Sequence, residues 1–238
     1  SGLQFESSAE KLMIANAVTA VVFLLIGGIL AVGVVLTRWP AIHWLEADTF
    51  YQVLTAHGID MLIFWIIFFE IAVLYFCAST LLRCRIATPK VAWLAFALML
   101  IGSVVNNIAV FRGASSVMMT SYVPMMAEPN FYLGLILFAV GALIAVFVFF
   151  GTLVVAKREK TYEGSVPLVT FGAITAAIIA VFTIASGAII LIPTWLMSIG
   201  VVKQVDPLVY RTIWWAFGHS SQQINVAAHI SVWYLVAA

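Results

Sequence analysis

The sequence predicts an all-α fold, a polytopic membrane bundle of six transmembrane helices, and its composition and hydropathy pattern carry that prediction. Hydrophobic residues make up 64% of the 238 residues and charged residues only 9%, whereas soluble domains average about 25% charged residues. Six continuous apolar runs are long enough to cross a hydrocarbon core of ~30 Å, which takes about 20 helical residues. The runs show no alternation with period two, so helices are predicted and a β-barrel is not. The runs cover residues 12–36, 50–82, 91–111, 131–156, 168–192 and 208–236, in a single transmembrane domain over residues 1–238.

The first two runs differ in their polar content. Glu6 and Glu10 make the start of the first run too acidic for a cleaved signal peptide, and the run is also too long for one. The second run carries His57, together with Asp60 and Glu70, the only carboxylates inside a predicted span. Two cysteines, Cys77 and Cys84, lie near its end, and their spacing of seven matches no metal motif, so packing or surface thiols are expected.

The remaining runs are separated by short loops, with one exception. Residues 112–130 are rich in Ser, Met and Pro, and we expect them to form a loop at the membrane interface. The sixth run is unusually polar: beyond His219 it contains Ser220, Ser221, Gln222, Gln223, Asn225 and His229.

Basic residues predict the orientation of the bundle. Three follow the second run and three follow the fourth, whereas the other loops carry one or two each; the six are Arg83, Arg85, Lys90, Lys157, Arg158 and Lys160. The positive-inside rule places these two loops and the N-terminus in the cytoplasm. The second and sixth helices then begin at the outer face. The net charge of +1 gives no argument for nucleic acid as a partner.

Two histidines inside these helices are candidate ligands. His57 lies about seven residues into the second run and His219 about eleven into the sixth, roughly 10 and 16 Å from the outer end at 1.5 Å per residue. Gly58 and Gly218 adjoin them, and a residue without Cβ would let a large planar group approach. An imidazole in hydrocarbon needs a partner, and a metal or haem iron is a strong candidate. A hydrogen bond to a neighbouring helix is the alternative.

Other ionisable residues have two interpretations each. Asp60, one turn from His57, is a candidate for a proton route: it either bonds a water or a haem propionate's partner, or faces an aqueous edge. Glu70 near mid-membrane is either a proton relay or a packed carboxyl group. His229 lies ~15 Å deeper than His219 and rotated by roughly 80°, so it cannot share an ion with it; it is a structural or proton-path residue. His43, in the first outer loop, is expected to be solvated.

The same residues resemble a known family. Thr55-Ala56-His57-Gly58 followed by Met61 is similar to the second helix of subunit I of the haem–copper oxidase superfamily, where this His is an axial ligand of the low-spin haem. Trp214-Trp215 through Gly218-His219 resembles that family's sixth helix, where the His ligates the active-site copper. Six helices match the first half of a twelve-helix subunit.

The resemblance implies three cofactors and at least two partners. The cofactors are a low-spin haem, a high-spin haem and copper, with His57 on the low-spin haem iron and His219 on the copper. The family's remaining ligands lie in later helices, so the other half of the catalytic subunit is an expected partner. An electron donor, either a subunit or cytochrome c or quinol, and membrane lipid are the others. A prokaryotic plasma membrane is the expected location.

The residue one turn beyond His219 bears on the substrate. Oxygen-reducing members commonly read His-Pro-x-x-Tyr, whereas this sequence reads His219-Ser-Ser-Gln-Gln223. Gln cannot donate an electron and a proton as a phenol can, and the nitric oxide reductases of the superfamily likewise lack the tyrosine. The resemblance therefore favours reduction of NO to N2O, with Gln223, Ser220 and Gln222 lining the pocket. Reduction of O2 to water is the alternative, and a non-catalytic subunit with helix-packing histidines is a third.

Overall fold

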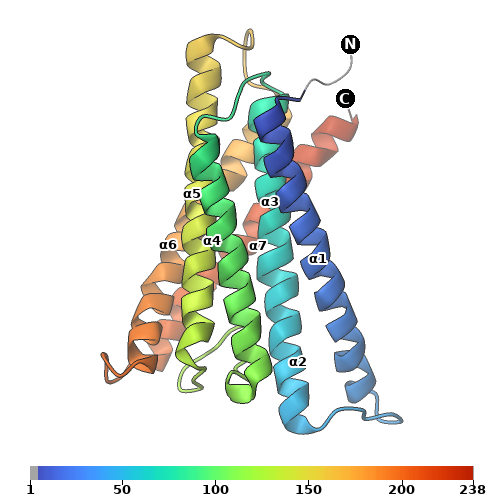
Figure 1. Ribbon diagram of the computed structural model, residues 1–238, viewed down its shortest axis with the longest axis vertical. Helices are drawn as coiled ribbons and strands as arrows, with labels where there is room; N and C mark the ends of the chain where they lie inside the picture. The colour runs from blue at the N-terminus through green and yellow to red at the C-terminus, as the bar shows by residue number, and fades with distance from the viewer. Residues whose placement is uncertain (1–4, 238) are drawn as a thin grey trace.

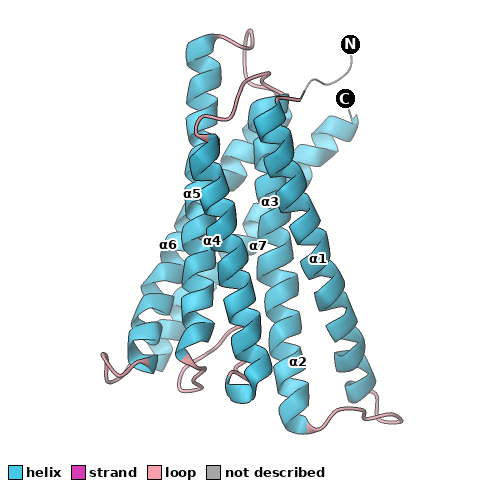
Figure 2. Cartoon of the chain, viewed as in Figure 1, coloured by secondary structure: helices cyan, strands magenta, loops and turns pink. Residues whose placement is uncertain are grey.

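The computed structural model describes residues 5–237 and is built from long helices joined by loops, with no strand in that part of the chain (Figure 2). Helix α1 spans Ser7–Arg38 and is capped by Glu6, whose carboxylate accepts hydrogen bonds from the backbone N–H groups of Ser8 and Ala9 at 3.1 and 3.0 Å. Such a cap satisfies donors that have no partner in the first turn of a helix. This cap lets the helix begin before the apolar run does.

The second span is one continuous helical rod with two π-helical turns. It consists of α2 (Ala47–Ile59), η1 (Asp60–Phe64), α3 (Trp65–Tyr75) and η2 (Phe76–Thr80). A π-helical turn inserts one extra residue per turn and rotates the side chains that follow it. The first such turn begins at Asp60, directly after the His57 turn.

The other spans follow the predicted runs and extend beyond most of them. They are α4 (Pro89–Ala109) with η3 (Val110–Ala114), α5 (Pro129–Glu159), α6 (Leu168–Ser198) and α7 (Pro207–Ala237). The fifth apolar run ends near Ile192, and α6 continues beyond it through Pro193 to Ser198. Proline removes one backbone hydrogen bond, which membrane helices tolerate where neighbouring helices surround them.

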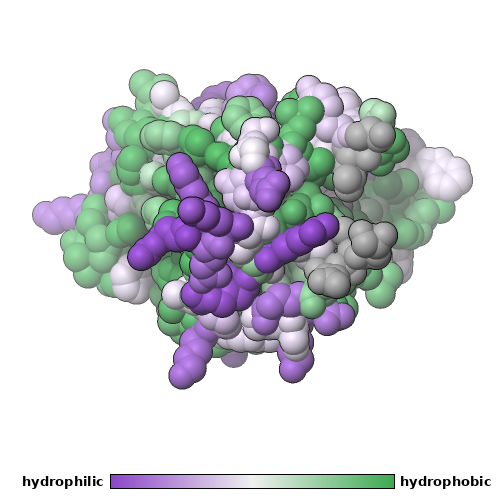
Figure 3. Space-filling view, turned by 90° about the horizontal axis from the view of Figure 1, so that it is seen from above, coloured by the Kyte–Doolittle hydropathy of each residue, from purple (hydrophilic) through white to green (hydrophobic). Residues whose placement is uncertain are grey.

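Five of these rods are long and apolar enough to cross a membrane, within the part of the chain that the structure describes. The sixth, α7, is as long as α5 and α6 but carries the polar run after His219. Figure 1 shows that α1 begins at the same end of the bundle as the loops after η2 and α5, and that α2 and α7 begin at the opposite end. Viewed from above, that first end carries many hydrophilic side chains (Figure 3).

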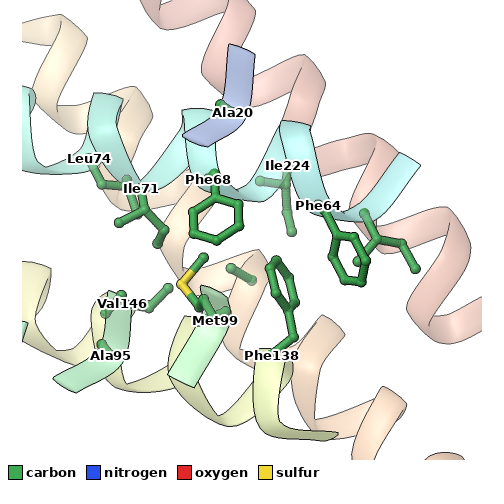
Figure 4. Close-up of a cluster of buried hydrophobic side chains, with 14 of the residues drawn as sticks. Ala20, Phe64, Phe68, Ile71, Leu74, Ala95, Met99, Phe138, Val146 and Ile224 are labelled. Carbon is green, nitrogen blue, oxygen red and sulfur yellow. The ribbon is translucent and has the colours of Figure 1, made fainter. Parts of the chain in front are cut away.

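The core lies where the second span packs against α4 and α5. Phe68 and Phe138 meet edge to face, with ring centroids 5.5 Å apart, and Phe64 lies 4.7 Å from the same Phe138 ring. Figure 4 shows these rings beside Met99. Helices α4 and α5 approach so closely that a Cβ at Gly134 would lie 2.7 Å from the carbonyl oxygen of Gly102. Small residues at such contacts drive helix association in membranes.

The loop between η3 and α5 is not a simple interfacial segment. Val117, Ser121 and Val123 are buried in it. The backbone N–H of Met118 donates to Thr55 Oγ1 of α2 at 2.9 Å, and Ser121 Oγ lies 2.9 Å from the hydroxyl of Tyr210 in α7. The loop therefore ties the start of α7 to the turn of α2 that precedes His57.

Candidate functional site

His57 is oriented by a hydrogen bond to another helix. Its Nδ1 atom lies 2.9 Å from the carbonyl oxygen of Gly27 in α1, and its side chain is half-buried. A carbonyl oxygen only accepts, so Nδ1 carries the proton and Nε2 keeps its lone pair. Nε2 has no hydrogen-bond partner among the described residues. Metal-ligating histidines characteristically donate their other N–H to a carbonyl or carboxylate, so this arrangement suits a ligand.

The glycines beside the two histidines do not leave open space. A Cβ at Gly58 would lie 3.0 Å from the Cβ of Met119, which comes from the loop after η3. A Cβ at Gly218 would meet the indole ring of Trp214 on the same helix. Met119, which is distant in the chain, covers Gly58, whereas Trp214, one turn earlier on the same helix, covers Gly218. That these glycines let a large planar group approach stays a prediction.

Asp60 is buried against α4. Its Oδ1 accepts a hydrogen bond from Asn107 Nδ2 at 2.8 Å, and its side chain is 0% exposed. The interpretation that Asp60 faces an aqueous edge is wrong for that reason. Oδ2 has no protein partner. The carboxyl group joins α2 to α4 at the start of the π-helical turn, on a different side of the second span from the cavity that Glu70 lines.

His219 lies on an uncovered face of α7. Its Nε2 atom lies 3.4 Å from the amide nitrogen of Gln223, one turn further along, and both side chains are exposed. Gln222 is exposed as well, and Ser220 is half-buried. Since α7 packs chiefly on α6, the rest of this chain leaves these polar groups uncovered. Polar side chains on a membrane helix face protein or a water-filled cavity far more often than lipid.

The two histidines lie at similar depths but on separate helices. Both α2 and α7 begin at the same end of the bundle (Figure 1). Counted from Ala47 and Pro207, where these helices start, His57 and His219 lie ~15 and ~18 Å along their axes at 1.5 Å per residue. Within the described residues α7 makes no packing contact with α2 comparable to its contact with α6. The chain thus brings the two imidazoles to one level without joining them.

Glu70 and His229 do come together. Both line a pocket between α3 and α7, and Glu70 also lines an inner cavity with Ser221, Asn225 and Ser231. In the sequence, Asn225 was noted only as part of the polar stretch after His219, and Ser231 was not noted. Their signal was the spacing of Ser221, Asn225 and Ala228 on α7, which places polar and small side chains on one helical face.

His43 and the cysteines have structural surroundings. His43 lies in the loop between α1 and α2, where its Nδ1 is 3.1 Å from the carbonyl oxygen of Thr37. Cys77 and Cys84 are both buried and unpaired. Among the described residues, no three His, Cys, Asp or Glu side chains cluster so as to hold a metal ion.

Comparison with known proteins finds one family and partial relatives. A family model described as cytochrome c and quinol oxidase polypeptide I matches residues 11–238. The chain is 29% identical over 177 residues to cytochrome c oxidase subunit 1 of Thermus thermophilus, which covers 72% of this chain and 30% of that protein. It also matches a chain of a heme-copper terminal oxidase dimer, with a TM-score of 0.85 and 26% identity over 96% of this chain and 39% of that one. The chain spans less than half the length of each.

Proposed function

The chain belongs to the cytochrome c and quinol oxidase polypeptide I family, and from that premise we propose that it is the N-terminal half of the catalytic subunit of a haem–copper reductase that converts NO to N2O. The observation that carries this proposal is Gln223. Its amide nitrogen lies 3.4 Å from His219 Nε2, in the position where oxygen-reducing relatives commonly carry a tyrosine.

His57 would hold the low-spin haem. The hydrogen bond from its Nδ1 to Gly27 leaves the Nε2 lone pair free for iron. The same hydrogen bond to the Gly27 carbonyl also constrains the plane of the His57 imidazole ring. The haems and copper, when bound, would supply the redox chemistry, while the protein holds and orients them.

His219 would hold the copper together with ligands from a partner. Its exposed side chain lies on a face of α7 that no other helix of this chain covers. The later helices of the subunit would cover that face and provide the missing histidines. Ser220, Gln222 and Gln223 would then line the pocket at the interface between the two halves.

The amide of Gln223 suits NO better than O2. Joining two NO molecules consumes two electrons and two protons, forms one N–N bond, breaks one N–O bond and yields N2O and water. No phenol is needed as an electron donor. The tyrosine nearest to His219 in sequence is Tyr210, which lies more than two turns earlier, is fully buried and is bonded to Ser121.

The second candidate function is reduction of O2 to water. It is favoured by the names of the two relatives, a cytochrome c oxidase subunit and a terminal oxidase. In that case another helix would have to supply the electron and proton that a tyrosine gives. The third candidate is a non-catalytic membrane subunit, in which the histidines would only pack helices.

The surroundings of the subunit complete the proposal. Electrons would come from a donor subunit, from cytochrome c or from quinol, and lipid would surround the bundle. The basic residues at the end where α1 begins support a cytoplasmic N-terminus in a prokaryotic plasma membrane.

Turnover by the intact complex tests the substrate. With a reduced donor, we expect consumption of NO and release of N2O, with little O2 uptake. Rapid O2 consumption with negligible NO turnover would establish the oxidase. An optical spectrum without haem bands would reject both enzyme functions and favour the packing role.

Substitution of the two histidines tests the ligand assignments. His219→Ala should remove copper and activity but leave the low-spin haem spectrum, and His57→Ala should remove that spectrum. His43→Ala is the matched control, because His43 lies in a loop and bonds only a backbone carbonyl; it should change neither. Loss of the low-spin haem in His219→Ala would mean that its helix is wrongly assigned.

A further inference from the structure

Two cavities meet at one carboxyl group in the middle of the bundle. The inner cavity, of about 60 Å³, lies between α3, α5, α6 and α7, and its polar lining is Glu70, Thr183, Ser221, Asn225 and Ser231. The second cavity, of about 210 Å³, is more open, lies between the second span and α7, and is lined by His229 among others. Glu70 and Asn225 are the polar residues that line both. They form the junction between the two cavities.

Glu70 lacks the protein partners that a fixed structural carboxyl group has. Its Oε1 atom is buried and has no hydrogen-bond partner among the described residues, unlike Asp60, whose Oδ1 is held by Asn107. No lysine or arginine lines either cavity, and α5 and α6 contribute only apolar residues and Thr183. Among the residues that the structure describes, His229 of α7 is the one other titratable group that lines these cavities. A buried polar atom of this kind is usually satisfied by water.

The cavities have room for that water. A cavity needs about 10–15 Å³ of free volume, and two to four polar partners, to hold one water molecule. The inner cavity exceeds this several-fold, and Ser221, Asn225 and Glu70 supply the partners. A carboxyl group joined to hydroxyl and amide groups through water is a typical arrangement for proton movement inside a membrane protein.

The order of the cavity-lining residues along α7 shows which end of the bundle each of them lies nearer to. His229 lies eight residues beyond Ser221, ~12 Å further along the helix. That puts it towards the end of the bundle where α1 begins. Ser221 lies on the turn of His219, and Asn225 lies between Ser221 and His229. The inner cavity therefore extends along α7 from Ser231, beyond the level of His229, to Ser221, which lies at the level of the proposed copper ligand on the opposite face of the helix.

We propose that Glu70 is a proton carrier that takes protons from the cavity lined by His229 and passes them, through water, to the Ser221 end of the inner cavity. The carboxylic acid releases its O–H proton to a cavity water and regains a proton from the other side, so Glu70 itself is unchanged after each transfer. This rests on the proposed function only in that the reaction consumes protons. The inference holds for NO and for O2.

The test uses the intact complex with Glu70→Gln, which preserves the shape of the side chain but removes its exchangeable acid proton. We expect turnover to fall at least ~10-fold, with the haem spectrum and copper content unchanged. Glu10→Gln is the matched control, since Glu10 is exposed in the first turn of α1, and it should retain full activity. Asn225→Leu, which replaces the amide at the junction, should slow turnover as well.

A second readout does not depend on activity. The infrared spectrum of the wild type should contain a carboxylic acid band that shifts promptly in D2O, is absent in Glu70→Gln and persists in Glu10→Gln. Full turnover in Glu70→Gln, or a Glu70 band that does not shift in D2O, would overturn the inference. If the wild type reduces neither NO nor O2, the proposed function fails. The D2O shift then still decides whether Glu70 exchanges its proton through the cavities.

Discussion

Asp60 and Glu70 are two carboxyl groups on one membrane rod, and their surroundings give them different roles. Asp60 is fully buried, with one oxygen held by Asn107. Glu70 lines two cavities and has a buried oxygen without a protein partner. The sequence offered both as proton-route candidates, because a carboxylate in an apolar run is unusual whichever role it has. Only the contacts of each side chain separate a helix-joining group from a proposed carrier.

At the residue scale, the hydrogen bond between Asp60 and Asn107 should stabilise the bundle. We expect Asp60→Ala and Asn107→Ala each to lower the free energy of unfolding. The double variant should lose less than the sum of the two, with a coupling of about 0.5–2 kcal/mol. Unfolding in mixed detergent micelles measures all three variants. Strict additivity would show that the contact contributes nothing to stability.

At the element scale, the close approach of α4 and α5 depends on glycine. A Cβ at Gly134 would lie 2.7 Å from the backbone nitrogen of Asn106 and from the carbonyl oxygen of Gly102. Both atoms belong to backbone, so neither yields as a flexible side chain would. Nearby, Asn106 Nδ2 donates to the carbonyl oxygen of Phe131 at 2.8 Å, and that bond depends on the same spacing.

Gly134→Ala should therefore destabilise the protein by about 1–3 kcal/mol, the usual cost of overpacking. Gly28→Ala is the control, because nothing lies within 4 Å of a Cβ at Gly28. There the higher helix propensity of alanine should leave stability equal or slightly improved. Thermal unfolding in detergent compares the two. Equal losses at both positions would contradict the packing argument.

The π-helical turn at Asp60, one of two in the second span, and the buried contacts of the loop after η3 are features that the sequence did not predict. The turn begins at Asp60 and changes which residues share a face. The loop was expected at the membrane interface, yet it buries side chains and bonds to Thr55 and Tyr210. Its role depends on partners distant in the chain, which composition does not reveal.

At the scale of the whole molecule, the two ends of the bundle differ in charge. The loops after η2 and α5 lie at the same end as the start of α1 (Figure 1), and six of the chain's basic residues lie in or beside those loops. The arrangement of helices agrees with the predicted topology. The side of the membrane is a separate matter, which labelling tests.

A cysteine at Ser165, in the loop after α5, should resist a membrane-impermeant maleimide in intact cells and react after permeabilisation. A cysteine at Gln204, in the loop before α7, should react in both. The native background is low: Cys77 is buried, and burial raises the pKa of the Cys84 thiol to about 11, so little thiolate forms at neutral pH. The opposite labelling pattern would reverse the orientation.

The sequence by itself determined the six helical rods, the end at which each begins, and the proximity of His219 and Gln223. Hydropathy is a property of consecutive residues, and a spacing of four within a helix follows from the helical period. Only the tertiary structure decided that Gly27 orients His57, that Met119 covers Gly58, and that Glu70 joins two cavities with Asn225. Those features depend on which helical faces meet, and residues distant in the chain make those contacts.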